Sequence, residues 1–109
     1  MGRLTSALLV SLFAAGAAAA GNVTVKEAKR GMAVTIDGTV DRITDSDEFK
    51  LRDETGVLEV YLGPNYVELR PGEKVTVSGF MDDGFVKELY ARKIVFEDGR
   101  VVELSHSYD

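Results

Sequence analysis

The 109-residue chain has no cysteine and no tryptophan, and it contains only one histidine and two prolines. Without cysteine there is no disulfide framework, and one histidine alone leaves too few ligands for a structural zinc site. That histidine, His106, stands between Ser105 and Ser107 near the end of the chain, where a base cannot be held rigidly for catalysis. We therefore expect no catalytic residue, no metal site and no cofactor.

The first twenty residues read as a secretory signal rather than as part of a fold. Arg3 supplies a short positive region, an apolar run follows, and alanines fill the segment up to Ala20. This pattern predicts a signal peptide over residues 1–20, cleaved near Ala20/Gly21, and leaves one domain over residues 21–109. We expect a periplasmic protein that is not inserted in the membrane after cleavage. The alternative interpretation is an uncleaved N-terminal anchor.

The mature part of the chain, after the predicted cleavage, carries more acidic than basic residues. Once Arg3 is removed, 12 basic residues face 18 acidic ones, which gives a net charge of −6. Such a domain repels nucleic acid phosphates and anionic membranes at long range. The negative net charge favours cationic or neutral partners. The other interpretation is that the charge only keeps a small exported domain solvated.

Thr24 and Glu27 form the pattern of a capping box, in which each side chain bonds the backbone amide of the other residue. Gly31 is suited to end a helix that begins there. The pattern predicts a short helix over residues 25–30, before the main sheet.

From Val34 onward the apolar residues recur with a period of two, which is typical of β-strands. Gly38 interrupts the first strand and predicts a bend. The alternation slips at Arg92 and Lys93, which predicts a bulge in the fifth strand. Turn residues separate the segments, and the Asp98–Gly99 turn leads to a last short strand over residues 101–104. Residues 63–72 break the pattern and have room for about one helical turn, from 65 to 69.

Several short strands punctuated by turns indicate a β-sandwich or a β-barrel. A long, glycine-bent first strand, with one irregular connection between the third and fourth strands, favours the barrel. We predict an all-β OB-fold, a five-stranded Greek-key barrel with a short N-terminal helix and an extra C-terminal strand.

Four segments also resemble the bacterial OB-fold (BOF) proteins, small periplasmic proteins described as stress-tolerance proteins. They are residues 25–28, 34–40, 49–60 and 74–79, and the most specific piece is the turn formed by Asp53, Thr55 and Gly56. The resemblance implies a non-enzymatic domain linked to envelope or oxidative stress and to cationic molecules or cell-wall sugars. The chain departs from the family pattern by lacking a tryptophan after the third strand and by its additional C-terminal hairpin.

The binding surface of OB-folds is usually the outer face of the second and third strands. Alternation places Lys50, Arg52, Glu59 and Tyr61 on that face. A basic pair beside an aromatic ring can stack on and hydrogen-bond a sugar or a base. The other interpretation is a solvated face with cross-strand ion pairs. Tyr66, Phe80 and Phe85 are candidates for the border of the face.

Acidic turns provide a second candidate site. Asp45, Asp47 and Glu48 lie on one turn, and Asp82 and Asp83 lie on another, so that both can flank the same face and attract a cation. Asp is also an ordinary turn residue, which explains the same pattern. A weaker resemblance links His106 and Tyr108 to the periplasmic haem chaperone of cytochrome c maturation.

These patterns together predict a periplasmic, non-catalytic OB-fold module for ligand binding or stress tolerance, whose ligand is a cationic small molecule or an envelope saccharide. One alternative is a nucleic-acid-binding protein, which the fold allows and the charge disfavours. The other is a structural accessory that docks an envelope protein through an exposed strand edge.

Overall fold

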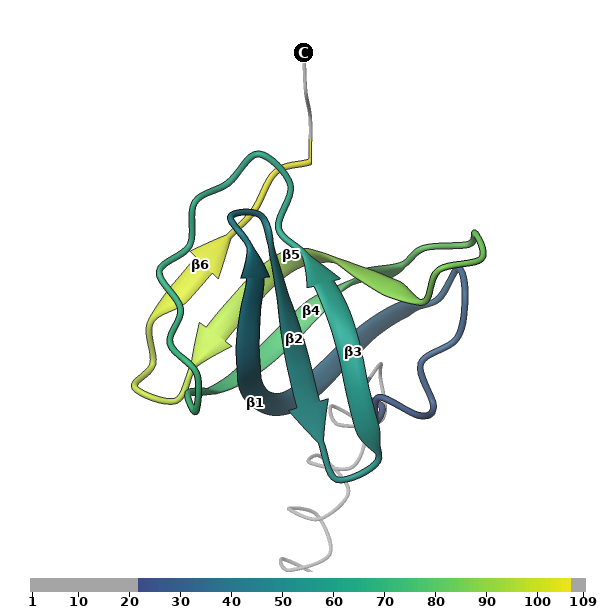
Figure 1. Ribbon diagram of the computed structural model, residues 1–109, viewed down its shortest axis with the longest axis horizontal. Helices are drawn as coiled ribbons and strands as arrows, with labels where there is room; N and C mark the ends of the chain where they lie inside the picture. The colour runs from purple at the N-terminus through teal and green to yellow at the C-terminus, as the bar shows by residue number, and fades with distance from the viewer. Residues whose placement is uncertain (1–21, 107–109) are drawn as a thin grey trace, which may run out of the picture.

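The computed structural model describes residues 22–106, so the predicted signal peptide and the last three residues lie outside the described part of the chain. Six β-strands follow one another along the sequence (Figure 1). They are β1 (Ala33–Asp45), β2 (Glu48–Asp53), β3 (Gly56–Tyr61), β4 (Lys74–Met81), β5 (Glu88–Phe96) and β6 (Val101–Glu103).

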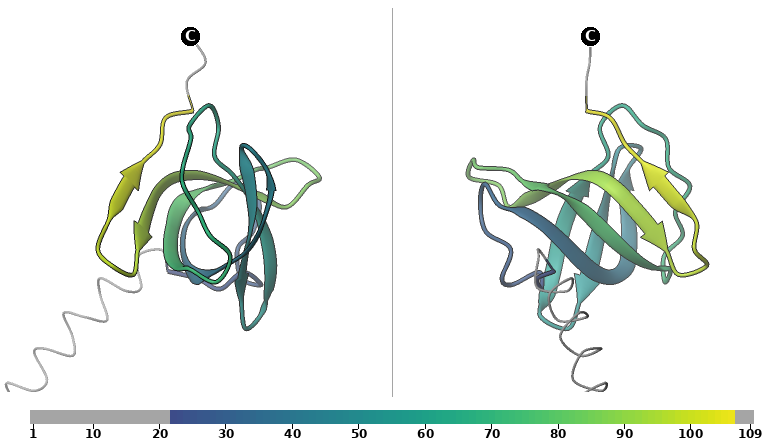
Figure 2. Two further views of the ribbon diagram at one scale, coloured as in Figure 1. Left: turned by 60° about the vertical axis from the view of Figure 1, so that its left-hand side comes forward. Right: turned by 180° about the vertical axis from the view of Figure 1, so that it is seen from behind.

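The strands form one sheet that closes on itself. Their order is β3-β2-β1-β4-β5-β6, and β3 also pairs with β5 in parallel, which joins the two ends of the five-stranded part. β6 pairs only with the end of β5 and stands beside the barrel (Figure 2). A meander of β1 to β3, followed by a return of β4 to the other side of β1, is a Greek-key connection. The predicted five-stranded OB barrel with an extra strand is confirmed.

β1 changes its partner at the predicted bend. Its first half pairs with β4 as far as Thr39, and its second half pairs with β2 from Thr39 onward. A Cβ atom on Gly38 would lie 2.7 Å from the backbone oxygen of Arg52. Glycine therefore lets β2 approach where β1 turns from one side of the barrel to the other.

The phase slip in β5 is a β-bulge. Lys93 pairs with Ser78 and Ala91 pairs with Gly79, so Arg92 is the additional residue. A Cβ atom on Gly79 would overlap the backbone oxygen of Tyr90, so a side chain there would collide with β5. The bulge re-aims the residues of β5 that precede it.

The inward-facing residues of all five barrel strands fill the interior. The largest side chains that are fully buried come from all five of these strands, and include Phe49, Ile36, Leu51, Leu58 and Leu89. Apolar residues outside the barrel strands also pack on this core, among them Val25, Val67 and Leu104. The core thus fixes which alternate residues of each strand must face outward.

The predicted helix over residues 25–30 is wrong, although its capping box is present. Thr24 and Glu27 exchange the two expected hydrogen bonds, of 2.9 and 3.2 Å. The Ala28 amide also bonds the Thr24 carbonyl, which makes one α-turn. The chain then leaves the helical path, because the Gly31 amide donates to the carbonyl of Met81 on β4. A turn this short gains more from barrel contacts than from propagating a helix.

The helical turn predicted between residues 65 and 69 is also wrong. The connection between β3 and β4 is irregular, with Val67 buried and Leu69 partly buried against the core. The Asn65 side chain donates to two carbonyls, those of Leu62 and Ser105, at 2.7 Å each. Side-chain anchors therefore replace helical hydrogen bonds in this segment. No helix among residues 22–106 has the length and apolar character needed to cross a bilayer.

Candidate functional site

The outer surface where β3 meets β5 carries two rows of facing side chains. Register pairs Glu48 with Tyr61 across β2 and β3, and Tyr61 with Tyr90 across β3 and β5. The same pairings form the second row, Lys50–Glu59–Glu88. Between the rows, the residues of these strands point into the core. The closure of the barrel therefore brings β2 and β5 to opposite sides of Tyr61.

Three rings gather at the first row. The ring centres of Tyr61 and Tyr90 are 5.5 Å apart, with planes tilted by 60°. The His106 ring stacks on Tyr90 at 5.8 Å, with planes 10° apart, and lies 5.7 Å from Tyr61. Phe80 extends the row onto β4 as the register partner of Tyr90, and the Arg92 guanidinium lies 5.5 Å from its ring. The row presents the flat, partly exposed rings on which ligands stack.

His106 reaches this cluster through the additional hairpin. The Leu104 amide bonds the Arg92 carbonyl at 2.9 Å, and the Leu104 side chain is buried. His106 Nε2 then bonds the carbonyl of Ala91. Ser105 and His106 are held more firmly than expected so near the end of the chain, because β6 and Asn65 fasten them to the barrel.

Gly63 makes room for the imidazole. Its φ is +70°, in the left-handed region that favours glycine, and an added Cβ would lie 2.8 Å from His106 Nδ1. The glycine after β3 is therefore part of the support of the cluster as well as of the chain reversal.

The first row and the start of β5 enclose a surface depression of about 720 Å³. Its lining residues are Glu48, Tyr61, Glu88, Tyr90 and His106. Two carboxyl groups thus share one depression with three rings, all held by strands of the barrel or by the segment after β6. This combination supplies both a stacking surface and hydrogen-bond acceptors.

Burial and neighbouring negative charges disfavour the ionised form of the carboxyl groups in the depression. Burial, a hydrogen bond with Glu48 and the charges of Glu48, Glu59 and Asp82 raise the pKa of Glu88 to about 7. Burial and the charge of Glu59 also raise the pKa of Glu48 above its ordinary value, as do Asp47 and Asp45 more weakly. The two acidic turns flank one face, as the sequence suggested, and their charges add at this point.

The four residues predicted from alternation do share the outer face, but they divide into separate contacts. Lys50 forms an ion pair of 3.3 Å with Glu59, and Arg52 forms one of 3.0 Å with Asp41. Tyr61 alone among the four lines the depression. Both basic side chains are thus engaged with neighbouring carboxylates.

The suggested border residues are spread over the surface. Phe80 continues the first row, whereas Tyr66 is 85% exposed on the connection between β3 and β4. Phe85 is 99% exposed in the connection between β4 and β5, which projects beyond the barrel beside the N-terminal segment (Figure 1). Lys87 joins these two segments by donating to the Val25 carbonyl at 2.8 Å.

Sequence reasoning missed Glu88 and Tyr90 as site residues, considered Glu48 only as part of a turn, and treated His106 as a tail residue. Alternation around the buried Leu89 indicates that Glu88 and Tyr90 face outward. Their meeting with β2 and β3 depends on the parallel closure, which no local pattern specifies.

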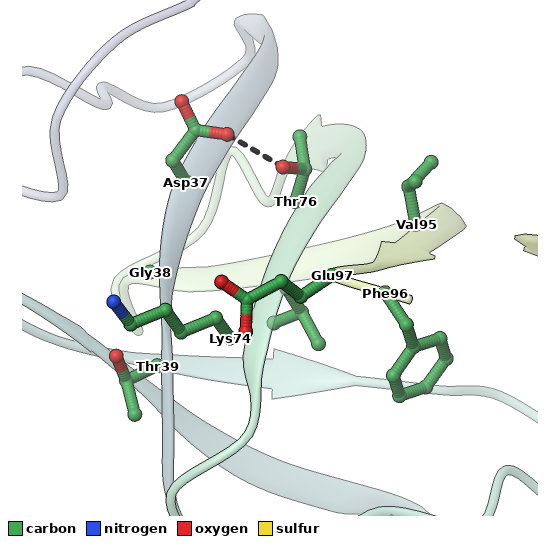
Figure 3. A pocket seen from close by; sticks show the side chains of 9 residues that line it. Asp37, Gly38, Thr39, Lys74, Thr76, Val95, Phe96 and Glu97 are labelled. Atoms are coloured by element: carbon green, nitrogen blue, oxygen red, sulfur yellow. Dashed lines mark hydrogen bonds between the residues drawn. The ribbon is translucent and has the colours of Figure 1, made fainter. Parts of the chain in front are cut away.

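Another groove, of about 400 Å³, runs over the outer face of β1, β4 and β5 (Figure 3). The Thr76 hydroxyl donates to Asp37 Oδ1 at 2.6 Å, and Lys74 and Thr39 lie beside them. The Thr76–Asp37 bond joins β4 to β1 across the face, as is usual for a solvated sheet surface. Within residues 22–106, no three His, Asp or Glu side chains are placed to hold a metal ion.

The closed five-stranded Greek-key barrel defines the chain as an OB-fold protein. Among solved structures it is similar to that of the hypothetical protein ygiW from E. coli, with a TM-score of 0.58 and 21% sequence identity. The match covers 69% of this chain and 86% of the other. No protein-family model and no curated protein match the sequence.

Proposed function

We propose that the chain is a periplasmic, non-catalytic OB-fold binding module of the bacterial OB-fold stress-tolerance type. It is exported by residues 1–20 and released by cleavage near Ala20/Gly21. Its ligand is a cationic small molecule bound in the depression between β2, β3 and β5. The observation that carries this proposal is the meeting of Glu48 and Glu88 with the rings of Tyr61 and Tyr90.

The chemistry of the depression fits an organic cation. Tyrosine faces attract ammonium and guanidinium groups, and this attraction grows as the cation loses water. Carboxylates supply charged hydrogen-bond acceptors for the same group. The raised pKa of Glu88 marks a place where added positive charge relieves repulsion.

An envelope saccharide is the other ligand class that the rings accommodate, since sugars also stack on aromatic faces. The pairing of Lys50 with Glu59 and of Arg52 with Asp41 leaves the outer face rich in carboxylate rather than in free basic groups. That pairing favours the cation over the saccharide and over nucleic acid.

The full chain, expressed in a bacterial host with its own leader, tests export and binding together. We expect a periplasmic product whose mass corresponds to cleavage near Ala20. In a thermal-shift assay, cadaverine or spermidine is expected to raise the melting temperature with dose, whereas a muropeptide and an oligonucleotide leave it unchanged.

Tyr61→Ala is expected to abolish that shift, and Tyr66→Ala is the matched control because it removes an exposed tyrosine that does not line the depression. A shift that survives in Tyr61→Ala, or one produced only by the muropeptide or the oligonucleotide, would contradict the cationic ligand or its place. A product that keeps its leader would contradict export with cleavage.

A further inference from the structure

The Glu48 and Glu88 side chains line the same depression although they come from β2 and β5, and each carboxyl acts on the pKa of the other as a hydrogen-bond partner. An ionised carboxylate only accepts hydrogen bonds, so two such groups bond directly only while one of them keeps a proton. The barrel strands fix both backbones: on β3, Glu48 is the register partner of Tyr61 and Glu88 is that of Glu59. The fold itself therefore makes the two groups compete for one proton.

The groups around this pair add to its negative field. From β3, Glu59 is the register partner of Glu88, and from the connection after β4, Asp82 acts on Glu88. Asp47 in the turn before β2 and Asp45 at the end of β1 act on Glu48.

On the other side of the balance, Lys50 is held by Glu59 at 3.3 Å, and the imidazole of His106 lines the depression beside the pair. The Tyr61 and Tyr90 rings form the remaining wall. Carboxyl groups thus act on the pair from β3, from the β1–β2 turn and from the connection after β4, which favours a retained proton.

We propose that the depression exchanges this shared proton for its cationic ligand: a primary ammonium group enters against Tyr61 and Tyr90 and takes the place of the proton between Glu48 and Glu88. This inference rests on the proposed function. The ammonium donates N–H groups to both carboxylates, and the displaced proton passes to solvent. One positive charge enters and one leaves, so the charge of the occupied site equals that of the empty site.

Two consequences distinguish this exchange from simple ion pairing. The affinity rises with pH, up to roughly tenfold per unit, while the pair is protonated, and it levels off once the proton is gone. The number of protons released on binding falls over the same range, from near one in mild acid to near zero in mild base. The module would therefore hold its ligand in neutral surroundings and release it when they become acidic.

Isothermal titration calorimetry of the exported protein with cadaverine tests the exchange. Cadaverine stays protonated throughout, because alkylammonium groups titrate near pH ~10. Titrations at about pH 6 and about pH 8, each in two buffers of different ionisation enthalpy, count the released protons. We expect close to one proton at the lower pH, close to none at the higher pH, and a dissociation constant roughly tenfold weaker at the lower pH.

Glu88→Gln removes the second carboxyl of the pair and is expected to give binding without proton release and without pH dependence over this range. Asp83→Asn is the matched control: it removes one charge from the neighbouring turn at an exposed residue, and it should keep the pH dependence. Binding that releases no proton at either pH in the unchanged protein would overturn the exchange and leave the proposed function standing. Absence of binding at both pH values would overturn both.

Discussion

Asp53 and Glu88 are both partly buried carboxyl groups at strand ends, yet their surroundings act on them in opposite ways. Burial by itself raises the pKa of Asp53, but hydrogen bonds from Thr55 and from the amides of Val25 and Gly56 outweigh it and lower that pKa. Burial also raises the pKa of Glu88, and there the neighbouring acids reinforce it, to about 7. Hydrogen-bond donors surround Asp53, whereas other carboxyl groups, which are acceptors when ionised, surround Glu88.

This difference in surroundings separates a carboxyl group that stabilises the fold, Asp53, from one that belongs to the candidate site, Glu88. The Asp53 carboxylate receives the Val25 amide at 2.9 Å and the Thr55 hydroxyl at 2.6 Å, so its charge fastens the N-terminal turn to the barrel. The Glu88 charge is left for something outside the fold to neutralise. The turn motif that carries the family resemblance is therefore explained by structure, and the ligand chemistry lies elsewhere.

The largest change in unfolding free energy is expected when the carboxylate of Asp53 is removed. Asp53→Ala leaves the amides of Val25, Thr55 and Gly56 without their acceptor. We expect a loss of roughly 2–3 kcal/mol in unfolding free energy, measured by chemical denaturation at neutral pH. Because the folded pKa lies below the ordinary value of 3.8, the stabilisation is present above that pH and is lost as pH falls through the folded pKa.

Asp41→Ala serves as the control, since it removes a partly exposed carboxylate that binds Arg52 at 3.0 Å. A surface pair of this kind contributes roughly 0–1 kcal/mol. Equal losses in the two variants would mean that Asp53 does not anchor the N-terminal turn.

The next effect concerns the support of the ring cluster. Gly63→Ala combines a left-handed φ of +70° with a Cβ placed 2.8 Å from His106 Nδ1. We expect a loss of roughly 2 kcal/mol, of which about 1 kcal/mol is backbone strain. Displacement of the imidazole should also expose Glu88 and lower its pKa, which NMR titration of the Glu88 side chain measures.

Gly72→Ala is matched for the strain, because its φ is +93° and no atom lies within 4 Å of the added Cβ. It should lose only the backbone contribution and leave the Glu88 titration in place. An unchanged Glu88 titration in Gly63→Ala would show that His106 plays no part in the burial of the depression.

Much of the barrel could be predicted, because a β-strand with one buried face repeats every two residues. The bend at Gly38 and the additional residue at Arg92 also left local traces, a glycine inside a strand and a slipped phase. The capping box at Thr24 was predicted as well, and its two hydrogen bonds form. The helix after it did not follow, since the Gly31 amide finds its partner on β4 rather than in the preceding turn.

The candidate site was predicted less completely. Tyr61 could be placed on the outer face from its own strand, but its contact with Tyr90 depends on parallel pairing between β3 and β5. Long-range pairing of this kind has no sequence period. His106 was missed because the three-residue strand β6 and the Asn65 side chain, rather than its own neighbours, determine its position.

Replacing Glu88, the carboxyl with the raised pKa, is expected to increase the stability of the fold. A carboxyl whose folded pKa is raised from 4.5 to about 7 keeps a proton that the unfolded chain loses, so stability falls as pH rises through this window. Glu88→Gln lacks this slope. Its advantage over the unchanged protein should be near zero below pH 4.5, grow toward pH 7 and then level off at about 1 kcal/mol, allowing for solvent screening.

Thermal unfolding at a series of pH values measures this gain. Glu54→Gln is the control, because Glu54 is an exposed acid of the turn after β2. It should track the unchanged protein at every pH. A Glu88→Gln variant that is less stable in neutral solution would mean that the charged Glu88 is favourably paired in the fold.

The smallest expected change in stability is that of Lys50→Ala, and this variant also tests which part of the outer face binds the ligand. Lys50 neutralises Glu59 at 3.3 Å, so Lys50→Ala should change stability by less than about 0.5 kcal/mol. It should strengthen cadaverine binding by roughly two- to fivefold, since Glu59 then adds its charge to the depression. Lys93→Ala removes the same charge from an exposed residue of β5 that does not line the depression, so the difference between the two variants isolates the local effect. Weaker binding in Lys50→Ala would instead place Lys50 in contact with the ligand, as the sequence first suggested, and would favour a saccharide held by the basic pair.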